Sequence, residues 1–353
     1  MTNENAACEV FVSLPRPQQP LPTSNSSGKG RFESLGVMVK DAWKQDLNPP
    51  SHAWVRYSLS AGIPLADFIE TFRELSTIKY AFGRRVFVHP VRMDHHEVEI
   101  DDFDHLVNPE TGQYEMEVQW RKKRCDGGSH ILFAVESTAE EAMRDHSTGL
   151  DALNALESLV RVTLGAMTVV QTRNTQHADL VSGKASDEAP KFHVYGSAEL
   201  PRRDNASIAA AIELAERSAS LPVSNVGRLS LGMRWANIAF KQHDLLSFWT
   251  AIEILAGCRG HKVYSVFAKA YGYAPGKGQT LAKKLGLDVI HALRGDLAHD
   301  GLPINMDPAG ASYFNALIHD LARYATSLPC LQLAQIALGD RRVEEWLRRE
   351  VIP

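Results

Sequence analysis

From residue 205 to its end the chain reads as a series of amphipathic helices, and this series constrains the fold more than any other feature. The segment "DLLSFWTAIEILAG" has Asp244 where an N-cap belongs and Gly257 just after its last apolar residue, the usual signals for a helix start and stop. A later segment, "DPAGASYFNALIHDLARYA", opens with Asp307 as N-cap and Pro308 in the first turn. Because short connections separate these segments, an all-α, up-and-down helical bundle is predicted for residues 205–353.

Four more segments of this region have helical character. They are "NASIAAAIELAERSA", "SNVGRLSLGMRWANIAF", "LGLDVIHALRGDLAHDG" and "DRRVEEWLRREVI". In the second, one apolar face repeats at helical spacing, and we expect it to point into the core: Leu229, Met233, Ala236 and Phe240.

The first part of the chain mixes strand and helix patterns, so the predicted fold class is α+β. The segments "HAWVRYSLS", "RRVFVHPVRM", "YEMEVQWRKK" and "SHILFAV" alternate or run apolar as strands do. A helix is predicted within 64–83, with one apolar face (Phe68, Phe72, Leu75 and Ile78), and one or two more within 140–170. Residues 176–204 are polar and contain two prolines, which indicates a domain junction. We therefore divide the chain into a Pro/Ser/Gly-rich tail (1–30), a mixed domain (31–204) and the helical domain (205–353).

Composition excludes several classes of protein. The 353 residues carry a net charge of −4, distributed unevenly: residues 205–353 hold 16 Lys+Arg against 13 Asp+Glu, about +3, which leaves about −7 for the rest. The four cysteines lie far apart in the sequence, so neither a zinc knuckle nor a redox motif is supported. The N-terminus lacks the pattern of a signal peptide, and no apolar run is long enough to span a membrane. A cytoplasmic protein without a membrane partner is expected.

Three motifs contain residue types that are common in functional sites, but their spacing does not fit such a site. "DHHEVEIDDFDH" (94–105) collects metal-ligand residue types without a ligand spacing, so a solvated acidic loop is preferred and no metal is predicted. "GYAPGKGQT" (272–280) departs from the phosphate-loop pattern and indicates a plain loop. A basic run, predicted to form a solvated hairpin tip with a weaker chance of contacting an RNA backbone, comprises Arg121, Lys122, Lys123 and Arg124.

The segment "LRGDLAHDG" places Arg294 five residues before His299 near the end of a predicted helix. That spacing alone is weak, because Arg84 and His89 repeat it within a strand pattern and helix ends often carry such residues. The motifs around the pair are more informative than its spacing. The pair follows "RLSLGMRWANIAF" and "FWTAIEIL" and precedes a glycine. In this order the motifs resemble the HEPN superfamily, in particular its Apea-like, defence-associated branch, over about residues 205–333.

The resemblance implies a HEPN-like helical domain and a metal-independent endoribonuclease that needs no cofactor. Arg294 and His299 would be catalytic, and the carboxylates of Asp296, Asp300 and Glu253 would support them. Histidine suits proton transfer near neutral pH, and arginine suits phosphate. On a regular helix, residues five apart point about 140° away from each other. The angle closes if His299 sits where the helix ends, or two copies in a homodimer complete the site, as the resemblance implies.

Such proteins act as toxins or as antiviral (abortive-infection) effectors in prokaryotes, so the mixed domain is expected to sense a phage or cellular trigger. The chain departs from the family pattern at Gly295, where a polar residue commonly follows the arginine. This keeps a second function open, a non-catalytic HEPN module that dimerises or binds RNA or protein. A third reading, another class of enzyme in the mixed domain, has no motif behind it.

Overall fold

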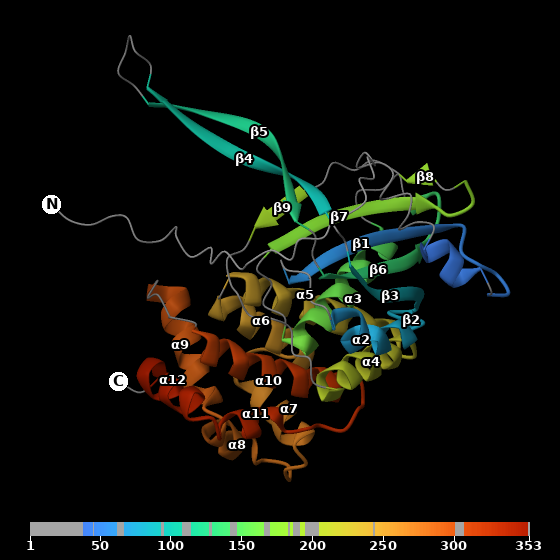
Figure 1. Cartoon of the computed structure of the whole chain (residues 1–353). Coiled ribbons are helices and arrows are strands. Elements are labelled where there is room, and N and C mark those ends of the chain that lie inside the picture. Colours follow the sequence, from blue (N-terminus) through green and yellow to red (C-terminus); the bar gives the residue numbers. More distant parts are fainter. Residues whose placement is uncertain are drawn as a thin grey trace.

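The computed structural model describes most of the chain, and Figure 1 labels its elements. Over β4, β5, β8, β9, several strand and helix ends and residues 296–300, the description covers the backbone path only. The described ranges are 38–44, 46–61, 67–92, 95–107, 114–126, 129–141, 147–165, 170–182, 184–185, 191–194, 205–242, 244–300 and 307–351. The predicted tail at 1–30 lies outside them.

The strands form a seven-stranded antiparallel sheet and a separate two-stranded hairpin. The sheet runs in the order β2-β3-β6-β1-β7-β8, with β9 also paired to β7, and the hairpin is β4-β5. The strands are β1 His52–Ala61, β2 Tyr80–Ala81, β3 Arg84–Arg92, β4 His95–Val107, β5 Tyr114–Asp126, β6 Ser129–Ser137, β7 Val170–Asp179, β8 Lys184–Ala185 and β9 Lys191–Val194. The four strands expected from alternating or apolar sequence patterns, β1, β3, β5 and β6, are confirmed.

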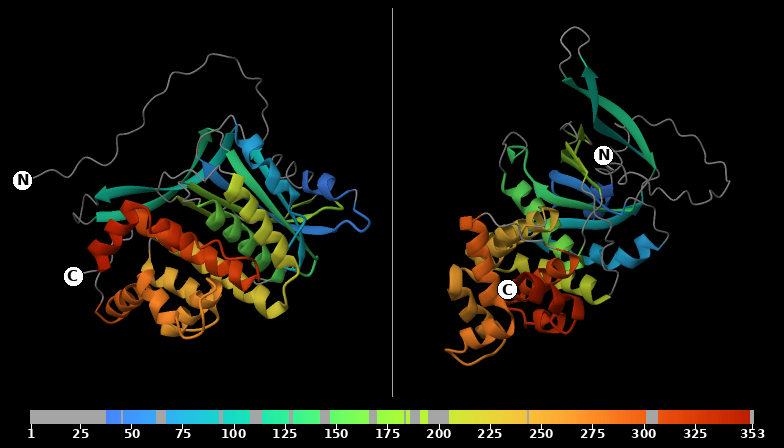
Figure 2. Two further views of the ribbon diagram at one scale, coloured as in Figure 1. Left: turned by 90° about the horizontal axis from the view of Figure 1, so that it is seen from below. Right: turned by 90° about the vertical axis from the view of Figure 1, so that its left-hand side faces the viewer.

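Helices lie below the sheet in Figure 1 and gather on one of its faces in both views of Figure 2. The 3₁₀ turns are η1 Arg73–Thr77 and η3 Gly260–Lys262. The α-helices are α2 Phe68–Phe72, α3 Thr148–Leu164, α4 Asn205–Ala219, α5 Val223–Gln242, α6 Leu245–Ala256, α7 Val263–Ala270, α8 Gly278–Lys284, α9 Leu287–Asp300, α10 Pro308–Ala325, α11 Leu333–Ala337 and α12 Arg341–Val351. The fold class is α+β, as predicted.

The predicted helix boundaries agree with the structure where side chains cap the helices. The Asp244 carboxylate accepts the backbone N–H groups of Leu246 and Ser247 at 3.1 and 2.9 Å. Gly257 ends α6 with a φ of +68°, a conformation in which glycine carries no steric penalty. The Asp307 carboxylate accepts the Gly310 N–H at 2.9 Å and starts α10. These polar groups satisfy backbone donors and acceptors that a helix end leaves open.

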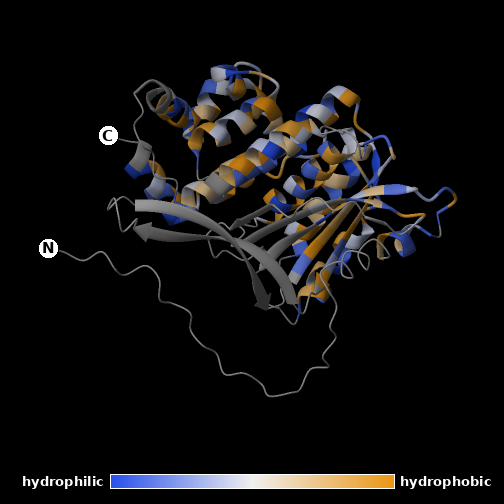
Figure 3. Ribbon diagram, turned by 90° about the horizontal axis from the view of Figure 1, so that it is seen from above, coloured by the Kyte–Doolittle hydropathy of each residue, from blue (hydrophilic) through white to orange (hydrophobic). Residues whose placement is uncertain are grey.

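Each face of the central strands has its own apolar cluster, because successive side chains of a strand point to opposite sides. Trp54, Val88 and Phe133 belong to the large cluster under the helices. Val55 and Leu132 belong to a smaller cluster on the opposite face, which also holds Val39 and Trp43 from a short helical segment at 38–43. Figure 3 shows hydrophobic positions along these central strands and along the helices beside them.

The large cluster runs without a break from the sheet into the C-terminal helices. Its members include Phe68 and Leu156 from the first part of the chain and Met233, Phe248 and Phe314 from the second. Helix α3 is the link, because it packs on β6, on α4 and on α5. The two segments separated at residue 204 in the sequence therefore share one core.

A close helix contact joins α5 to α6. A Cβ atom added at Gly232 would lie 2.6 Å from Cγ and Cδ2 of Leu255, so any larger residue would force the Leu255 side chain to move. The predicted face of α5 agrees, because Leu229, Met233 and Ala236 are fully buried. Phe240 is partly buried and meets Phe248 of α6 edge to face, with 4.8 Å between ring centroids.

A buried carboxylate holds the C-terminal helices together. Asp320 on α10 is fully buried. It accepts the Tyr271 hydroxyl at 2.5 Å and the backbone N–H groups of Leu333 and Ala334 at 3.0 Å each. The last two are orphan donors at the start of α11, so Asp320 caps that helix from a distance.

The sequence interpretation of residues 94–126 needs correction. Residues 95–107 form strand β4 rather than an acidic loop, and they pair along their whole length with β5. The basic run 121–124 lies within β5, where each residue pairs with a residue of β4, so it does not form a hairpin tip. The register places Glu97 opposite Arg124 and Glu99 opposite Lys122. Opposite charges at these two facing positions favour the antiparallel pairing, whereas Asp104 stands opposite Glu117.

Strand β7 is a second correction. Residues 176–204 were assigned to a polar domain junction, whereas β7 extends to Asp179 and pairs with β1 in the middle of the sheet. The helix predicted within 64–83 ends earlier than its pattern suggested. Helix α2 gives way to η1, and residues 80–81 form β2, although Phe68, Phe72, Leu75 and Ile78 are all buried as predicted. Within the described ranges no helix is long and apolar enough to cross a membrane.

Candidate functional site

Helix α9 carries the predicted Arg294–His299 pair, and its backbone is helical through Asp300. Arg294 is partly buried, and the side chains of His299, Asp296 and Asp300 lie outside the described atoms. Because the helix does not end before His299, the two residues leave the backbone about 140° apart. His299 is the penultimate residue of α9, so whether one chain or a dimer completes the pair stays a prediction.

Glu253 on α6 is partly buried and holds the loop that follows its own helix. Its Oε1 accepts the indole N–H of Trp249 at 3.0 Å and the backbone N–H of Gly260 at 2.7 Å. The first partner lies one turn earlier on α6, and the second opens η3. Glu253 thus supports the candidate site by fixing this loop, and the structure shows no ion pair between it and Arg294.

His291 also belongs to this site, and the sequence reasoning missed it. It lies three residues before Arg294, so both side chains leave the same side of α9. Its ring centroid is 5.3 Å from that of Trp249 and 6.2 Å from that of Tyr264. A Cβ atom built on Gly260 would lie 3.7 Å from its Nε2. The spacing to Arg294 was visible in the sequence, but a histidine within an apolar helix is more often a packing residue.

Burial and neighbouring charge set the protonation of His291. Desolvation lowers its pKa below 6.5, and Arg294 and His261 lower it further, while Glu253 opposes them. A histidine with a lowered pKa is neutral at neutral pH and can accept a proton. The corner formed by α6, η3 and α9 therefore combines a neutral imidazole, a guanidinium and a carboxylate that fixes the loop.

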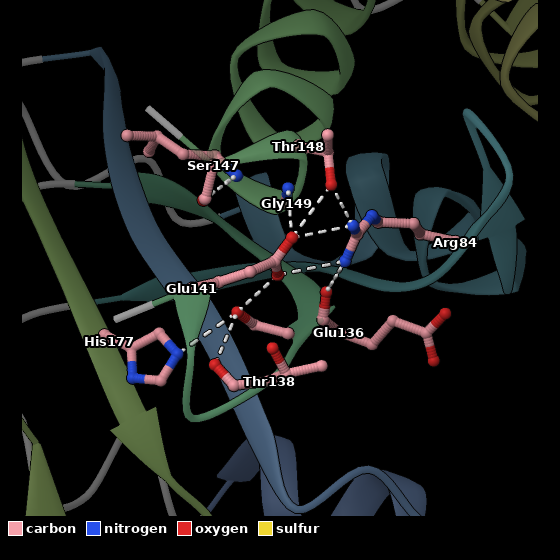
Figure 4. Close-up of polar contacts among 10 residues, drawn as sticks. Arg84, Glu136, Thr138, Glu141, Ser147, Thr148, Gly149 and His177 are labelled. Carbon is pink, nitrogen blue, oxygen red and sulfur yellow. Dashed lines mark hydrogen bonds and ion pairs between the residues drawn. The ribbon is translucent and has the colours of Figure 1, made fainter. Parts of the chain in front are cut away.

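A second polar centre lies where α3 meets the sheet (Figure 4). Glu141 accepts hydrogen bonds from Ser137 at 2.8 Å, Thr148 at 2.8 Å and the Gly149 N–H at 3.2 Å, and it forms an ion pair with Arg84 at 2.8 Å. Burial would raise the pKa of this carboxyl, but hydrogen bonds from Ser137, Thr148 and Arg84 lower it to about 2. The ionised carboxylate thus secures the first turn of α3 to the sheet.

The same centre contains a serine and a histidine, with Ser137 Oγ 3.1 Å from His177 Nε2. Desolvation lowers the pKa of His177 below 6.5, and His52, whose ring stacks on it, adds to the effect. In a nucleophilic triad the carboxylate orients the histidine. Here Glu141 binds the serine hydroxyl instead, and Ser137 is buried. We therefore assign a structural role to this network.

A third polar group lies between α3 and the sheet. Arg56 on β1 donates to Glu157 and Asn154 of α3 at 2.7 Å each and to Thr175 of β7 at 2.7 Å. Arg161 pairs with the other Glu157 oxygen at 3.0 Å. Glu157, Arg56 and Arg161 are all buried, and each charge has a partner, which is what a buried ion triad requires. This group connects the helix to the sheet.

The other sequence candidates lie away from α9 or outside the described side chains. Arg84 and His89 are in β3, as expected, and His89 contacts Ser76 at 2.9 Å rather than Arg84. For residues 121–124 the structure gives only their place in β5. Among the described residues, no three His, Cys, Asp or Glu side chains come together in a way that could hold a metal ion. Comparison of the chain with protein-family models, curated proteins and solved structures finds no match.

Proposed function

We propose that this chain is a metal-independent endoribonuclease in which Arg294 binds the scissile phosphate and His299 transfers protons. One observation carries the proposal: Arg294 has no ion-pair partner among the described residues, and it lies on the helix whose last turn contains His299. A guanidinium without a carboxylate partner among the described side chains, near the neutral imidazole of His291, is suited to an anionic ligand. In the cell the chain would act as an effector of a prokaryotic toxin or antiviral system.

The reaction needs no group beyond these side chains and the RNA itself. A neutral histidine takes the proton of the ribose 2′-hydroxyl, and the 2′-oxygen attacks the adjacent phosphorus. The bond from phosphorus to the 5′-oxygen breaks, and a protonated histidine supplies the proton that this oxygen needs. The products are a 2′,3′-cyclic phosphate and a 5′-hydroxyl end, with arginine offsetting charge on the phosphate oxygens. The substrate must be single-stranded or looped, since the 2′-oxygen has to reach an in-line position.

A HEPN-like homodimer would bring two copies of the pair together, because Arg294 and His299 diverge within one chain. The order of α5, α6 and α9, with their motif residues, supports this domain assignment. An exposed apolar stripe on α5 supports the dimer: Leu231 and Ile238 are 45% and 37% exposed, with the partly buried Trp235 between them. In a two-fold dimer each such stripe meets its own copy.

The shared core supports a sensing role for the first part of the chain. Helix α3 contacts both the sheet and α5, so a trigger that shifts the sheet would also shift the helices. The trigger would be a phage or cellular component.

Cleavage of a mixed RNA pool in EDTA tests the proposal. The wild-type protein should cleave, and both His299→Ala and Arg294→Gln should reduce the rate at least 100-fold. The control is Arg341→Gln, which removes an equal charge from an exposed ion pair on α12. Expression in bacterial cells gives a parallel readout, because the wild type should arrest growth and His299→Ala should not. Cleavage that survives His299→Ala unchanged would refute the assignment.

A second function, a non-catalytic dimerising or binding module, is favoured by one observation. Gly295 stands where the family carries a polar residue, and nothing lies within 4 Å of the Cβ position there. This function predicts a dimer without cleavage. Sedimentation should then show that Leu231→Lys with Ile238→Lys yields a monomer, whereas Val223→Lys, a change at an 89% exposed site on the same helix, does not.

A further inference from the structure

Most of the arginines whose side chains the structure describes form ion pairs. Eleven of them contact a carboxylate, and Arg217 donates to the backbone carbonyl of Thr326. Within the described part of the chain, three arginines have neither kind of partner: Arg228, Arg259 and Arg294. We call these three residues the arginine cluster.

All three lie around the loop 257–262, although they come from different elements. Arg228 of α5 reaches the end of α6, because a Cβ atom at Gly257 would lie 2.7 Å from its Nη1. Arg259 belongs to the loop itself and is exposed. Arg294 lies three residues after His291 on α9, which packs against η3, and the Nε2 of His291 lies 3.7 Å from the Cβ position of Gly260.

Positive charges outnumber negative charges among the described residues around the loop 257–262. The loop also carries the exposed His261 and Lys262, and the carboxylate of Glu253 is engaged by Trp249 and Gly260. The Arg228 Nε atom is buried and has no hydrogen-bond partner. Gathering like charges costs free energy unless an anion compensates them, and a buried guanidinium N–H without an acceptor adds to that cost. The arrangement therefore has the properties of an anion-binding surface.

We propose that the arginine cluster binds the phosphate backbone of a single-stranded RNA. The choice of RNA as the anion rests on the proposed function. Arginine binds phosphate through two parallel N–H groups, and three arginines on separate supports can hold successive phosphates. The partly exposed ring of His291, held against Trp249 and Tyr264, offers a flat surface on which a base can stack.

The loop geometry assists this role. Gly260 has a φ of +59°, and Glu253 fixes its N–H, so the loop is held in one conformation before a ligand arrives. A preorganised site loses less conformational entropy on binding. Arg228 also lies at the C-terminal end of α6, where a cation is favoured by the helix dipole, so the test needs a readout that a purely structural role would not change.

Salt dependence of binding provides that readout. A fluorescein-labelled single-stranded RNA is titrated with protein by anisotropy at several KCl concentrations, in a His299→Ala background that keeps the RNA intact. Each phosphate contact contributes about 0.7 to the slope of log K against log salt for single strands. Replacing all three arginines by glutamine should lower the slope by about 2 and weaken binding at least 10-fold at low salt. The matched control replaces Arg341, Arg342 and Arg348 of α12 by glutamine, an equal change in charge.

The binding measurements test the proposal independently of nuclease activity. If the triple variant and the α12 control give equal slopes and affinities, the proposal is wrong. Arg259→Gln alone, in an exposed loop, should lower the slope by about 0.7 and covers the case in which the triple variant does not fold. A polyglutamate peptide of the same charge that binds as tightly as the RNA would overturn the assignment to RNA. If the arginine substitutions lower the salt slope as predicted but the wild-type protein does not cleave RNA, the binding surface is supported and only the proposed reaction is refuted.

Discussion

The Glu253 carboxylate on α6 accepts the backbone N–H of Gly260 at 2.7 Å, and this contact fixes the loop on which His291 packs. This contact defines the structural role of the glutamate in the "WTAIEIL" segment. Glu253 orients neither Arg294 nor His299 directly. Instead it determines the path of the chain from α6 into η3 and adds a negative charge beside His291.

The pKa of His291 should respond in opposite directions to two neighbouring substitutions. Glu253 raises this pKa and Arg294 lowers it. Glu253→Gln should therefore lower the His291 pKa further, and Arg294→Gln should raise it toward 6.5. Glutamine at 253 keeps an oxygen that can accept the Gly260 N–H, so the loop should persist. Titration of the His291 ring by NMR measures both shifts, and two shifts of the same sign would contradict this electrostatic account.

Two glycines of α5 should behave oppositely when replaced by alanine. Gly232→Ala forces a methyl group to within 2.6 Å of Leu255, so we expect the free energy of unfolding to fall by about 1–3 kcal/mol. Gly227→Ala, on the same helix, meets nothing within 4 Å and should raise it by about 0.5–1 kcal/mol through helix propensity. Urea unfolding of the two variants provides the comparison, and equal effects would show that α5 and α6 are not packed this closely.

Gly295→Ala should likewise stabilise the chain by up to about 1 kcal/mol, because its Cβ position is open and the residue lies within α9. Gly295→Asn restores the polar residue that commonly follows the arginine in the resembling family. If that residue assists catalysis, Gly295→Asn should cleave RNA faster than Gly295→Ala, although alanine is the better helix former. Equal cleavage rates would show that the departure at this position has no catalytic consequence.

Glu141 should stabilise the fold in a pH-dependent way. Its folded pKa is about 2, below the ordinary 4.5, so the stabilisation is present above pH 4.5 and is lost as the pH falls toward 2. Glu141→Gln breaks a mostly buried ion pair with Arg84, and we expect a loss of about 3 kcal/mol near pH 7. Glu216→Gln, at an exposed site on α4, serves as the control. A Glu141→Gln effect that stays constant down to pH 2 would contradict the assignment.

Histidines add a second pH dependence at higher pH. The pKa values of His89, His177 and His291 are lowered in the folded protein, mainly by burial. The unfolded chain then binds more protons, so the free energy of unfolding should fall as the pH drops below about 6.5. His177→Gln should flatten this part of the stability curve relative to the wild-type protein. Chemical denaturation at pH 7.5 and pH 5.5 measures the difference.

Local signals made the helices predictable. Asp244, Gly257 and Asp307 act on backbone groups within a few residues, so their role can be read from neighbouring sequence. The alternating strands β1, β3 and β6 were predictable for the same reason, since their apolar positions face two cores.

Strands β4 and β7 were not predicted, because each pairs with residues that lie far away in the sequence. On β7, the inward positions Thr175 and His177 are polar because they face Arg56 and Ser137, so the apolar alternation of a strand is absent. On β4, Glu97 and Glu99 stand opposite Arg124 and Lys122, which lie more than 20 residues later in the sequence. Neither partner can be recognised from the segment itself.

The candidate site was predictable only in part. The positions of Arg294 and Glu253 were identified, but the grouping of His291, Gly260 and the arginine cluster depends on how α5, α6 and α9 pack. The helical segment "LGLDVIHALRGDLAHDG" was predicted and is α9, but what the side chain of Arg294 lies against could not be read from it.

The most direct test of the central claim is the chemistry of the RNA ends. A defined single-stranded RNA would be incubated with purified protein in EDTA, and its fragments analysed by mass spectrometry. The account predicts 2′,3′-cyclic phosphate and 5′-hydroxyl ends that are absent with Arg294→Gln and with His299→Ala. Fragments with 3′-hydroxyl and 5′-phosphate ends, or cleavage that survives both substitutions, would contradict it.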